Sequence, residues 1–145
     1  MAHVEASITV NRPIAEVFAF VTDFSKAVQW QSGLIEAGVT SSGPVGVGST
    51  FKWIASFAGQ KMDTGGQLTV WDPPNQYGYK TTAGPVPGGG GFTFKAEGNS
   101  TLVKQYGDFE PGGFFKLAEG LIMKQIEGQF QESVKKLKQV VEAGG

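Results

Sequence analysis

Residues 114–142 read FFKLAEGLIMKQIEGQFQESVKKLKQVVE and carry the strongest structural signal in this chain of 145 residues. Apolar side chains recur there every three or four positions, and Lys, Glu and Gln fill most places between them. This spacing predicts an amphipathic helix. A helix of roughly 28 residues is ~42 Å long, so it needs a large apolar surface to lie on. The apolar stripe consists of Ala118, Ile122, Ile126, Phe130, Val134, Leu137 and Val141.

Two glycines, Gly120 and Gly128, fall inside this predicted helix. Each costs on the order of 1 kcal/mol relative to alanine in a helix interior. They indicate either a close approach of another backbone or a bend, and the sequence does not distinguish the two.

The residues before this helix alternate between apolar and polar side chains, which predicts strands. Turn residues separate these segments at 58–59, 72–75 and 97–99. The connections are too short for crossover helices, so we expect neighbouring strands to be antiparallel. The expected strands cover residues 4–10, 34–39, 49–57, 60–70, 76–82, 92–96 and 101–109.

Two short helices are expected after the first strand. Asn11-Arg12-Pro13 ends that strand, and Pro13 suits the first position of a helix because its missing N–H would have no partner there. The apolar spacing that follows predicts a helix ending near Thr22–Asp23, and a second helical turn is expected over residues 24–30.

Composition excludes several classes of site. The chain has 12 Lys and Arg against 13 Asp and Glu, which gives no excess of cations for a nucleic-acid backbone. It has no cysteine and one histidine, His3, so it offers neither disulfides nor a cysteine or histidine metal site. We expect no metal and no cofactor.

No segment approaches the ~20 apolar residues of a membrane span, and the N-terminus lacks the pattern of a secretory signal. We therefore expect a cytoplasmic protein without stable membrane insertion, as a monomer or homodimer. Without repeats or linkers, residues 1–145 are interpreted as one domain. Lys135, Lys136 and Lys138 form a basic cluster that is either a solvated helix face or a docking surface for an anionic membrane.

Several stretches resemble one known family. Residues 11–23, NRPIAEVFAFVTD, followed by Trp30, resemble the opening of polyketide cyclase/dehydrase-like proteins of the SRPBCC (START-like) superfamily. The segments 48–51, 70–75 and 100–103 and the final helix are similar to the same group. The resemblance extends over essentially the whole chain. It implies an α+β helix-grip fold, in which a curved antiparallel sheet of six to seven strands wraps around the long C-terminal helix.

The resemblance also implies an elongated hydrophobic cavity between sheet and helix. Members of the superfamily bind apolar or aromatic small molecules there, including lipids and polyketides, and some catalyse cyclisation or dehydration. The partner expected for this chain is therefore a hydrophobic small molecule. The residues expected to line its cavity are Trp30, Phe51, Trp53, Phe57, Met62, Tyr79, Phe92, Phe94, Gln105, Phe114, Leu121 and Met123.

Catalytic residues are not evident. If Met62 and Thr64 point inward, alternation along the strand turns Asp63 toward solvent. The same alternation places Gln105 and Tyr106 on opposite faces, so only one of them can reach a cavity.

The glycine-rich stretch 84–91 lacks the Lys-Ser/Thr pair and the following helix of a phosphate-binding loop. It is expected to form a mobile hairpin near the cavity mouth. Three functions remain open: a non-catalytic binder or carrier, a cyclase or dehydratase, and a subunit-contact protein whose cavity has collapsed.

Overall fold

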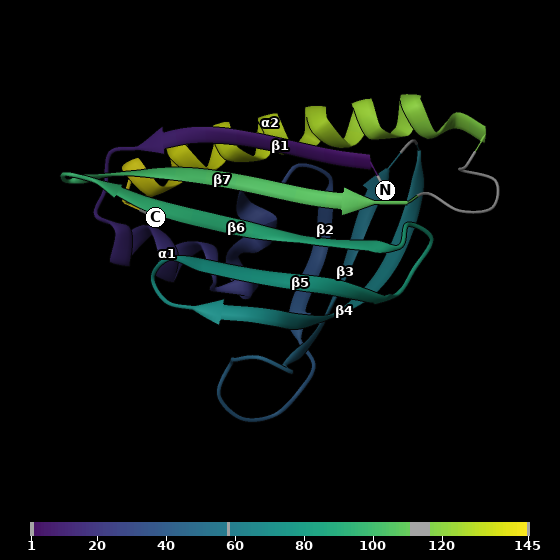
Figure 1. The fold of residues 1–145 in the computed structure, drawn as a ribbon, viewed down its shortest axis with the longest axis horizontal. Coiled ribbons are helices and arrows are strands. Elements are labelled where there is room, and N and C mark those ends of the chain that lie inside the picture. The colour runs from purple at the N-terminus through teal and green to yellow at the C-terminus, as the bar shows by residue number, and fades with distance from the viewer. Residues whose placement is uncertain (1, 58, 111–116, 145) are drawn as a thin grey trace.

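A seven-stranded antiparallel sheet in the order β1-β7-β6-β5-β4-β3-β2 forms the body of the molecule (Figure 1). The structure is a computed structural model that describes residues 2–57, 59–110 and 117–144. Its elements in chain order are β1 (Ala2–Val10), α1 (Ile14–Val21), the 3-10 helix η1 (Phe24–Gln29), β2 (Leu34–Val39), β3 (Thr50–Phe57), β4 (Gln60–Asp72), β5 (Gln76–Ala83), β6 (Gly88–Glu97), β7 (Ser100–Phe109) and α2 (Glu119–Glu142). This confirms the α+β helix-grip fold.

The long helix α2 runs along β1 and packs mainly against β1 and β7 (Figure 1). It begins at Glu119, with Ala118 as its N-cap. Residues 114–116 of the expected helix lie outside the described ranges. Gly120 and Gly128 do not reflect a close backbone approach, since a Cβ at either position would meet nothing within 4 Å.

Two groups of buried side chains hold the sheet to the helices. One joins α1 to β4–β7 and to Leu137 and Val141 near the end of α2. The other joins β1 and Phe109 to the middle of α2 through Phe130 and Val134. The middle and the C-terminal part of the long helix stripe therefore bury apolar surface, which is the main stabilising contribution for such a helix.

The glycine run differs from its expected loop. Gly88–Gly91 belong to β6, where Gly90 pairs with Tyr79 of β5 and with Gly107 of β7. A Cβ at Gly90 would lie 2.4 Å from the carbonyl oxygen of Tyr106, and one at Gly91 would lie 2.1 Å from that of Tyr77. These contacts leave no room for a side chain, so this part of the sheet requires glycine. Because glycines show no alternation of polar and apolar side chains, the sequence does not reveal the strand.

Pro13 is the N-cap of α1, whereas the sequence suggested it as the first helical residue. Its backbone is extended, with φ −61° and ψ 150°. Its carbonyl accepts hydrogen bonds from the N–H groups of Glu16 and Val17, both at 3.1 Å. The proline carbonyl thus starts the helical ladder although its own backbone is not helical.

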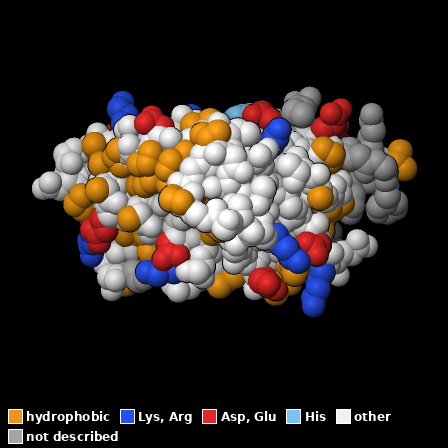
Figure 2. All heavy atoms as spheres, turned by 90° about the horizontal axis from the view of Figure 1, so that it is seen from below, with side chains coloured by type: hydrophobic (Ala, Val, Ile, Leu, Met, Phe, Trp, Pro, Cys, Tyr) orange, Lys and Arg blue, Asp and Glu red, His pale blue; other side chains and the backbone are white. Residues whose placement is uncertain are grey.

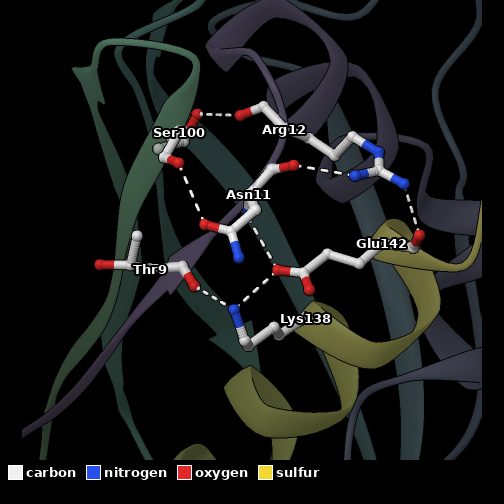
Figure 3. Close-up of polar contacts among 7 residues, drawn as sticks. Thr9, Asn11, Arg12, Ser100, Lys138 and Glu142 are labelled. Carbon is white, nitrogen blue, oxygen red and sulfur yellow. Dashed lines mark hydrogen bonds and ion pairs between the residues drawn. The ribbon is translucent and has the colours of Figure 1, made fainter.

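A polar network, here called the Glu142 network, ties the end of α2 to the turn after β1 (Figure 3). Glu142 Oε2 accepts the backbone N–H of Asn11 at 2.8 Å and a hydrogen bond from Lys138 Nζ at 2.7 Å. Lys138 also donates to the carbonyl of Thr9 at 2.8 Å, and Arg12 Nη2 donates to the carbonyl of Glu142. One of the three lysines of the basic cluster is therefore engaged in structure.

None of the helices in the described ranges is both long enough and apolar enough to cross a membrane. On the face in Figure 2, positive and negative side chains lie interspersed around the edge, and hydrophobic side chains gather toward one end.

Candidate ligand cavity between the sheet and the long helix

A cavity of about 170 Å³ lies between the sheet, η1 and α2. Its walls draw on both groups of buried side chains, with Tyr77 and Phe92 from one and Phe109 and Phe130 from the other. It is therefore situated where the two groups meet, and side chains do not fill it. The sheet wall includes Phe51, Trp53, Met62, Thr64, Tyr77, Tyr79, Phe92, Gln105 and Phe109. The helical wall includes Phe24, Ala27, Ile126, Gln129, Phe130 and Ser133.

Aromatic rings form most of the sheet wall. Phe51 and Trp53 stack with centroids 5.1 Å apart, and Tyr79 meets both of them edge-on at 5.6 and 5.5 Å. Tyr77 and Phe92 stack at 5.6 Å on adjacent strands. Alternation along β3, β5 and β6 brings these side chains to one face of the sheet. The resulting surface suits a flat or apolar molecule.

This wall has few polar atoms, and one of them, Oε1 of Gln105, has no hydrogen-bond partner. The Gln105 side chain is 8% exposed, and its Oε1 atom is buried without a hydrogen-bond partner. Neither phenol of Tyr77 or Tyr79 bonds to another side chain or backbone group within the described ranges. Thr64 is also buried on this wall.

The two wall tyrosines are held in the protonated form. Burial raises the pKa of Tyr77 well above its ordinary value, and the neighbouring Tyr79 and Tyr106 add to the shift. Burial likewise raises the pKa of Tyr79, with a further contribution from Tyr106. At neutral pH both phenols are therefore hydroxyl groups that can donate and accept hydrogen bonds.

Charged groups are nearly absent from the walls. Among the side chains described, no carboxylate lines the cavity, and Lys52 is its one charged residue. Lys52 Nζ lies 3.9 Å from Asp63 Oδ2, and the Asp63 side chain is 67% exposed. No group of three His, Asp or Glu residues in the described ranges is placed to hold a metal ion.

The loop between η1 and β2 lines the cavity and is bonded to α2. The Ser32 N–H donates to Ser133 Oγ at 2.9 Å, and Ser32 Oγ donates to Glu132 Oε2 at 3.0 Å. Gly33 fits here with φ +79°, and a Cβ would lie 2.9 Å from the Ser56 carbonyl oxygen. These contacts fix the loop on the helix beside the cavity.

Half of the predicted lining residues surround this cavity: Phe51, Trp53, Met62, Tyr79, Phe92 and Gln105. Their role in ligand binding remains a prediction.

Asp63 faces solvent, and Tyr106 lies on the opposite face from Gln105, where its hydroxyl accepts a hydrogen bond from Gln76 Nε2 at 3.0 Å. The alternation argument for these residues is confirmed.

Four predicted residues lie elsewhere. Trp30 and Phe94 belong to the group of buried side chains that packs against α1, and Met123 belongs to the group under α2. Leu121 is 62% exposed, because it lies outside the face of α2 that meets the sheet. The remaining two, the side chain of Phe57 and Phe114, fall outside what the structure describes.

Several lining residues were not in the predicted set. Tyr77 shares a strand face with Tyr79, so alternation alone could have added it. Phe130 lies on the predicted helix stripe, but the stripe does not tell which of its members meet core and which meet the cavity. Phe24 and Phe109 lie at the edges of elements, where periodicity carries little information.

Comparisons with known proteins agree with this architecture. The family model described as polyketide cyclase / dehydrase and lipid transport matches residues 1–142. No curated protein sequence matches the chain. Among solved structures, the protein TTHA0849 from Thermus thermophilus is similar with a TM-score of 0.86 and 20% identity, over 99% of this chain and 100% of that chain.

Two further structures carry descriptive names. A START superfamily protein from Mycobacterium smegmatis has a TM-score of 0.74 and 19% identity, over 97% of each chain. The Zhui aromatase/cyclase from Streptomyces sp. R1128 has a TM-score of 0.69 and 17% identity, over 98% of this chain and 82% of that one. At these identities the structural likeness establishes the fold alone. The match over residues 1–142 establishes that the chain belongs to the polyketide cyclase/dehydrase and lipid transport family.

Proposed function

We propose that this protein binds a small, uncharged, largely apolar molecule in the cavity between the sheet and α2. The observation that carries the proposal is a cavity of about 170 Å³ with aromatic walls and no carboxylate among its described lining residues. Apolar walls with a few polar groups are typical of binding sites for small molecules.

The unfilled cavity does not support the third function, a subunit-contact protein with a collapsed cavity. Of the other two, binding without chemical conversion is the better supported. A general acid or base works best with a pKa near the working pH. The pKa values of Tyr77 and Tyr79 are shifted upward, away from neutrality. Lys52 is exposed beside Asp63, which favours a role at the surface.

A cyclase-type activity is the second candidate, because the two protonated phenols are available to orient a carbonyl group. In that case a linear poly-β-ketone would be converted over many turnovers, and Tyr79→Phe would lower the rate without loss of fold. Product formation no faster than in buffer would exclude this activity for the substrate tested.

The binding proposal is tested by titrating the protein with toluene and following backbone amide chemical shifts. We expect saturable shifts around the cavity. Trp53→Ala should weaken toluene binding about fivefold, because an aromatic contact contributes ~0.5–1.5 kcal/mol beyond its buried area. Trp71→Ala is the matched control, since Trp71 packs against Phe18 at 5.5 Å and is not among the lining residues.

The control variant should lose stability while it keeps its affinity for toluene. Absence of saturable shifts in the wild-type protein would contradict the proposed function. If Trp53→Ala mainly unfolds the protein, Trp53 is part of the core and the assignment of the cavity wall is wrong.

A further inference from the structure

The buried amide of Gln105 lacks a hydrogen-bond partner that its own sheet could supply. On one side its strand neighbour is Ala6 of β1, and on the other it is Phe92 of β6. Both neighbours are apolar, and Oε1 of Gln105 is buried without a partner. A buried amide oxygen is normally satisfied, so an exception calls for a specific explanation.

This amide also lies on the wall of the cavity. Gln105, Phe92 and Tyr77 are register partners on the adjacent strands β7, β6 and β5, and all three line the cavity. Neighbouring strands are about 4.8 Å apart. A molecule that lies against the ring of Phe92 is therefore within reach of the amide on one side and of the Tyr77 ring on the other.

The volume between the walls favours a small molecule. A cavity of about 150 Å³ lined by apolar side chains binds benzene, and the present one is about 170 Å³. Pockets for drug-sized ligands measure about 300–1,000 Å³. The space therefore fits one aromatic ring with a small substituent better than a long acyl chain.

The chemistry of the walls selects the substituent. A carboxylate would need a buried cation, and Lys52 is exposed beside Asp63. A hydroxyl group both donates and accepts, so it satisfies an amide oxygen or an amide N–H equally well. An aldehyde or ketone oxygen can accept only from Nε2 of Gln105, and it leaves Oε1 without a partner.

We propose that Gln105 is the polar anchor of the cavity, and that the ligand is a small phenol whose hydroxyl bonds to this amide while its ring packs against Phe92 and Tyr77. The inference rests on the proposed function, because it names the ligand class for the same cavity.

The test compares phenol with toluene, which has a methyl group in place of the hydroxyl. Dissociation constants are measured by amide chemical-shift titration for the wild type, for Gln105→Met and for Gln125→Met. Methionine keeps the length of the side chain and removes the amide. Gln125 is exposed on α2 and serves as the matched control.

We expect Gln105→Met to weaken phenol binding relative to toluene binding about fivefold to tenfold, as for the loss of one buried hydrogen bond. Gln125→Met should leave this ratio unchanged. The ligand-free Gln105→Met protein should also melt about 3 °C higher or more, because it no longer buries an unsatisfied oxygen. A purely structural role of Gln105 would lower the melting temperature instead.

The outcomes separate the two claims. An unchanged ratio in Gln105→Met, or equal affinity of the wild type for both probes, would overturn the anchor and leave the cavity intact as a binding site. If neither probe binds to the wild type, the proposed function fails. Should Gln105→Met not fold, the side-chain amide signals of Gln105 in the wild type decide, since only phenol should shift them strongly.

Discussion

Gly90 is one of the residues of the sheet that leave no room for a methyl group. Its position between β5 and β7 leaves 2.4 Å between a Cβ and the Tyr106 carbonyl oxygen. A backbone oxygen in a paired strand cannot move aside without breaking the ladder. The glycine run is therefore required by close strand packing, and not by a need for flexibility.

Gly90→Ala should accordingly destabilise the protein by on the order of 2 kcal/mol or more, as expected when a substitution overpacks a buried site. Gly120→Ala is the control, because nothing lies within 4 Å of its Cβ. It should stabilise the protein by up to about 1 kcal/mol through helix propensity. Urea denaturation of both variants measures the difference, and equal effects would contradict the packing argument.

Individual aromatic residues also show what sequence patterns cannot predict about the candidate site. Trp30 and Trp53 are both large aromatic residues, and both were expected at the cavity. Trp30 is 2% exposed and meets Phe92 edge-on at 5.6 Å, whereas Trp53 lies on the cavity wall. Nothing in the local sequence distinguishes them, because the difference depends on how far α2 and η1 lie from the sheet at each point.

At the scale of elements, the Glu142 network fixes the end of α2 to the first strand. The backbone N–H of Asn11 and the ammonium of Lys138 both hold the pKa of the Glu142 carboxyl below its ordinary value of 4.5. A carboxyl group with a lowered pKa in the folded protein stabilises that protein at pH values above 4.5. This contribution is lost as the pH falls through the lower, folded-state pKa.

Glu142→Gln should therefore lower the melting temperature at pH 7, and the difference from the wild type should shrink as the pH falls below 4.5. Thermal unfolding between pH 3 and pH 7 follows both proteins. The control is Glu127→Gln, an exposed glutamate on the same helix. A gap between Glu142→Gln and wild type that is constant over the whole range would show that the carboxylate charge is not involved.

Periodicity predicted most elements well, because each helix or strand repeats its own pattern of apolar positions. The β6 strand was only partly recognised, since its first four residues are glycines. The boundary at Pro13 was shifted by one residue, because the carbonyl that starts the helix belongs to a residue whose own backbone is extended.

The whole molecule has a shared core that joins its helices to the sheet. The first group of buried side chains combines residues of β1, α1, β4–β7 and α2. We therefore expect the sheet and the long helix to unfold together as one cooperative unit. Trp30 lies in this group and touches the row of cavity aromatics through Phe92.

Trp30→Ala should lower the free energy of unfolding by about 3–5 kcal/mol, the usual range for removing a buried aromatic ring. Denaturation of the variant is followed by far-UV circular dichroism and by fluorescence, and the two signals should change at the same denaturant concentration. Two separate transitions would mean that α2 and the sheet form independent units.

The sequence by itself determined the helical and strand patterns of apolar residues, the order of elements and the family. Periodicity and turn residues are properties of neighbouring positions, so they can be read directly from the chain. The antiparallel strands and the long helix follow from them, and so does the placement of Gln105 and Tyr106 on opposite faces of their strand. Only the tertiary structure decided which aromatic residues surround a space and which fill one. That outcome depends on the curvature of the sheet and on the distance of α2 and η1 from it, which arise from contacts between residues far apart in the chain. The tertiary structure alone also reveals the unpartnered oxygen of Gln105. Whether an amide has a hydrogen-bond partner depends on all the residues that surround it in the folded protein.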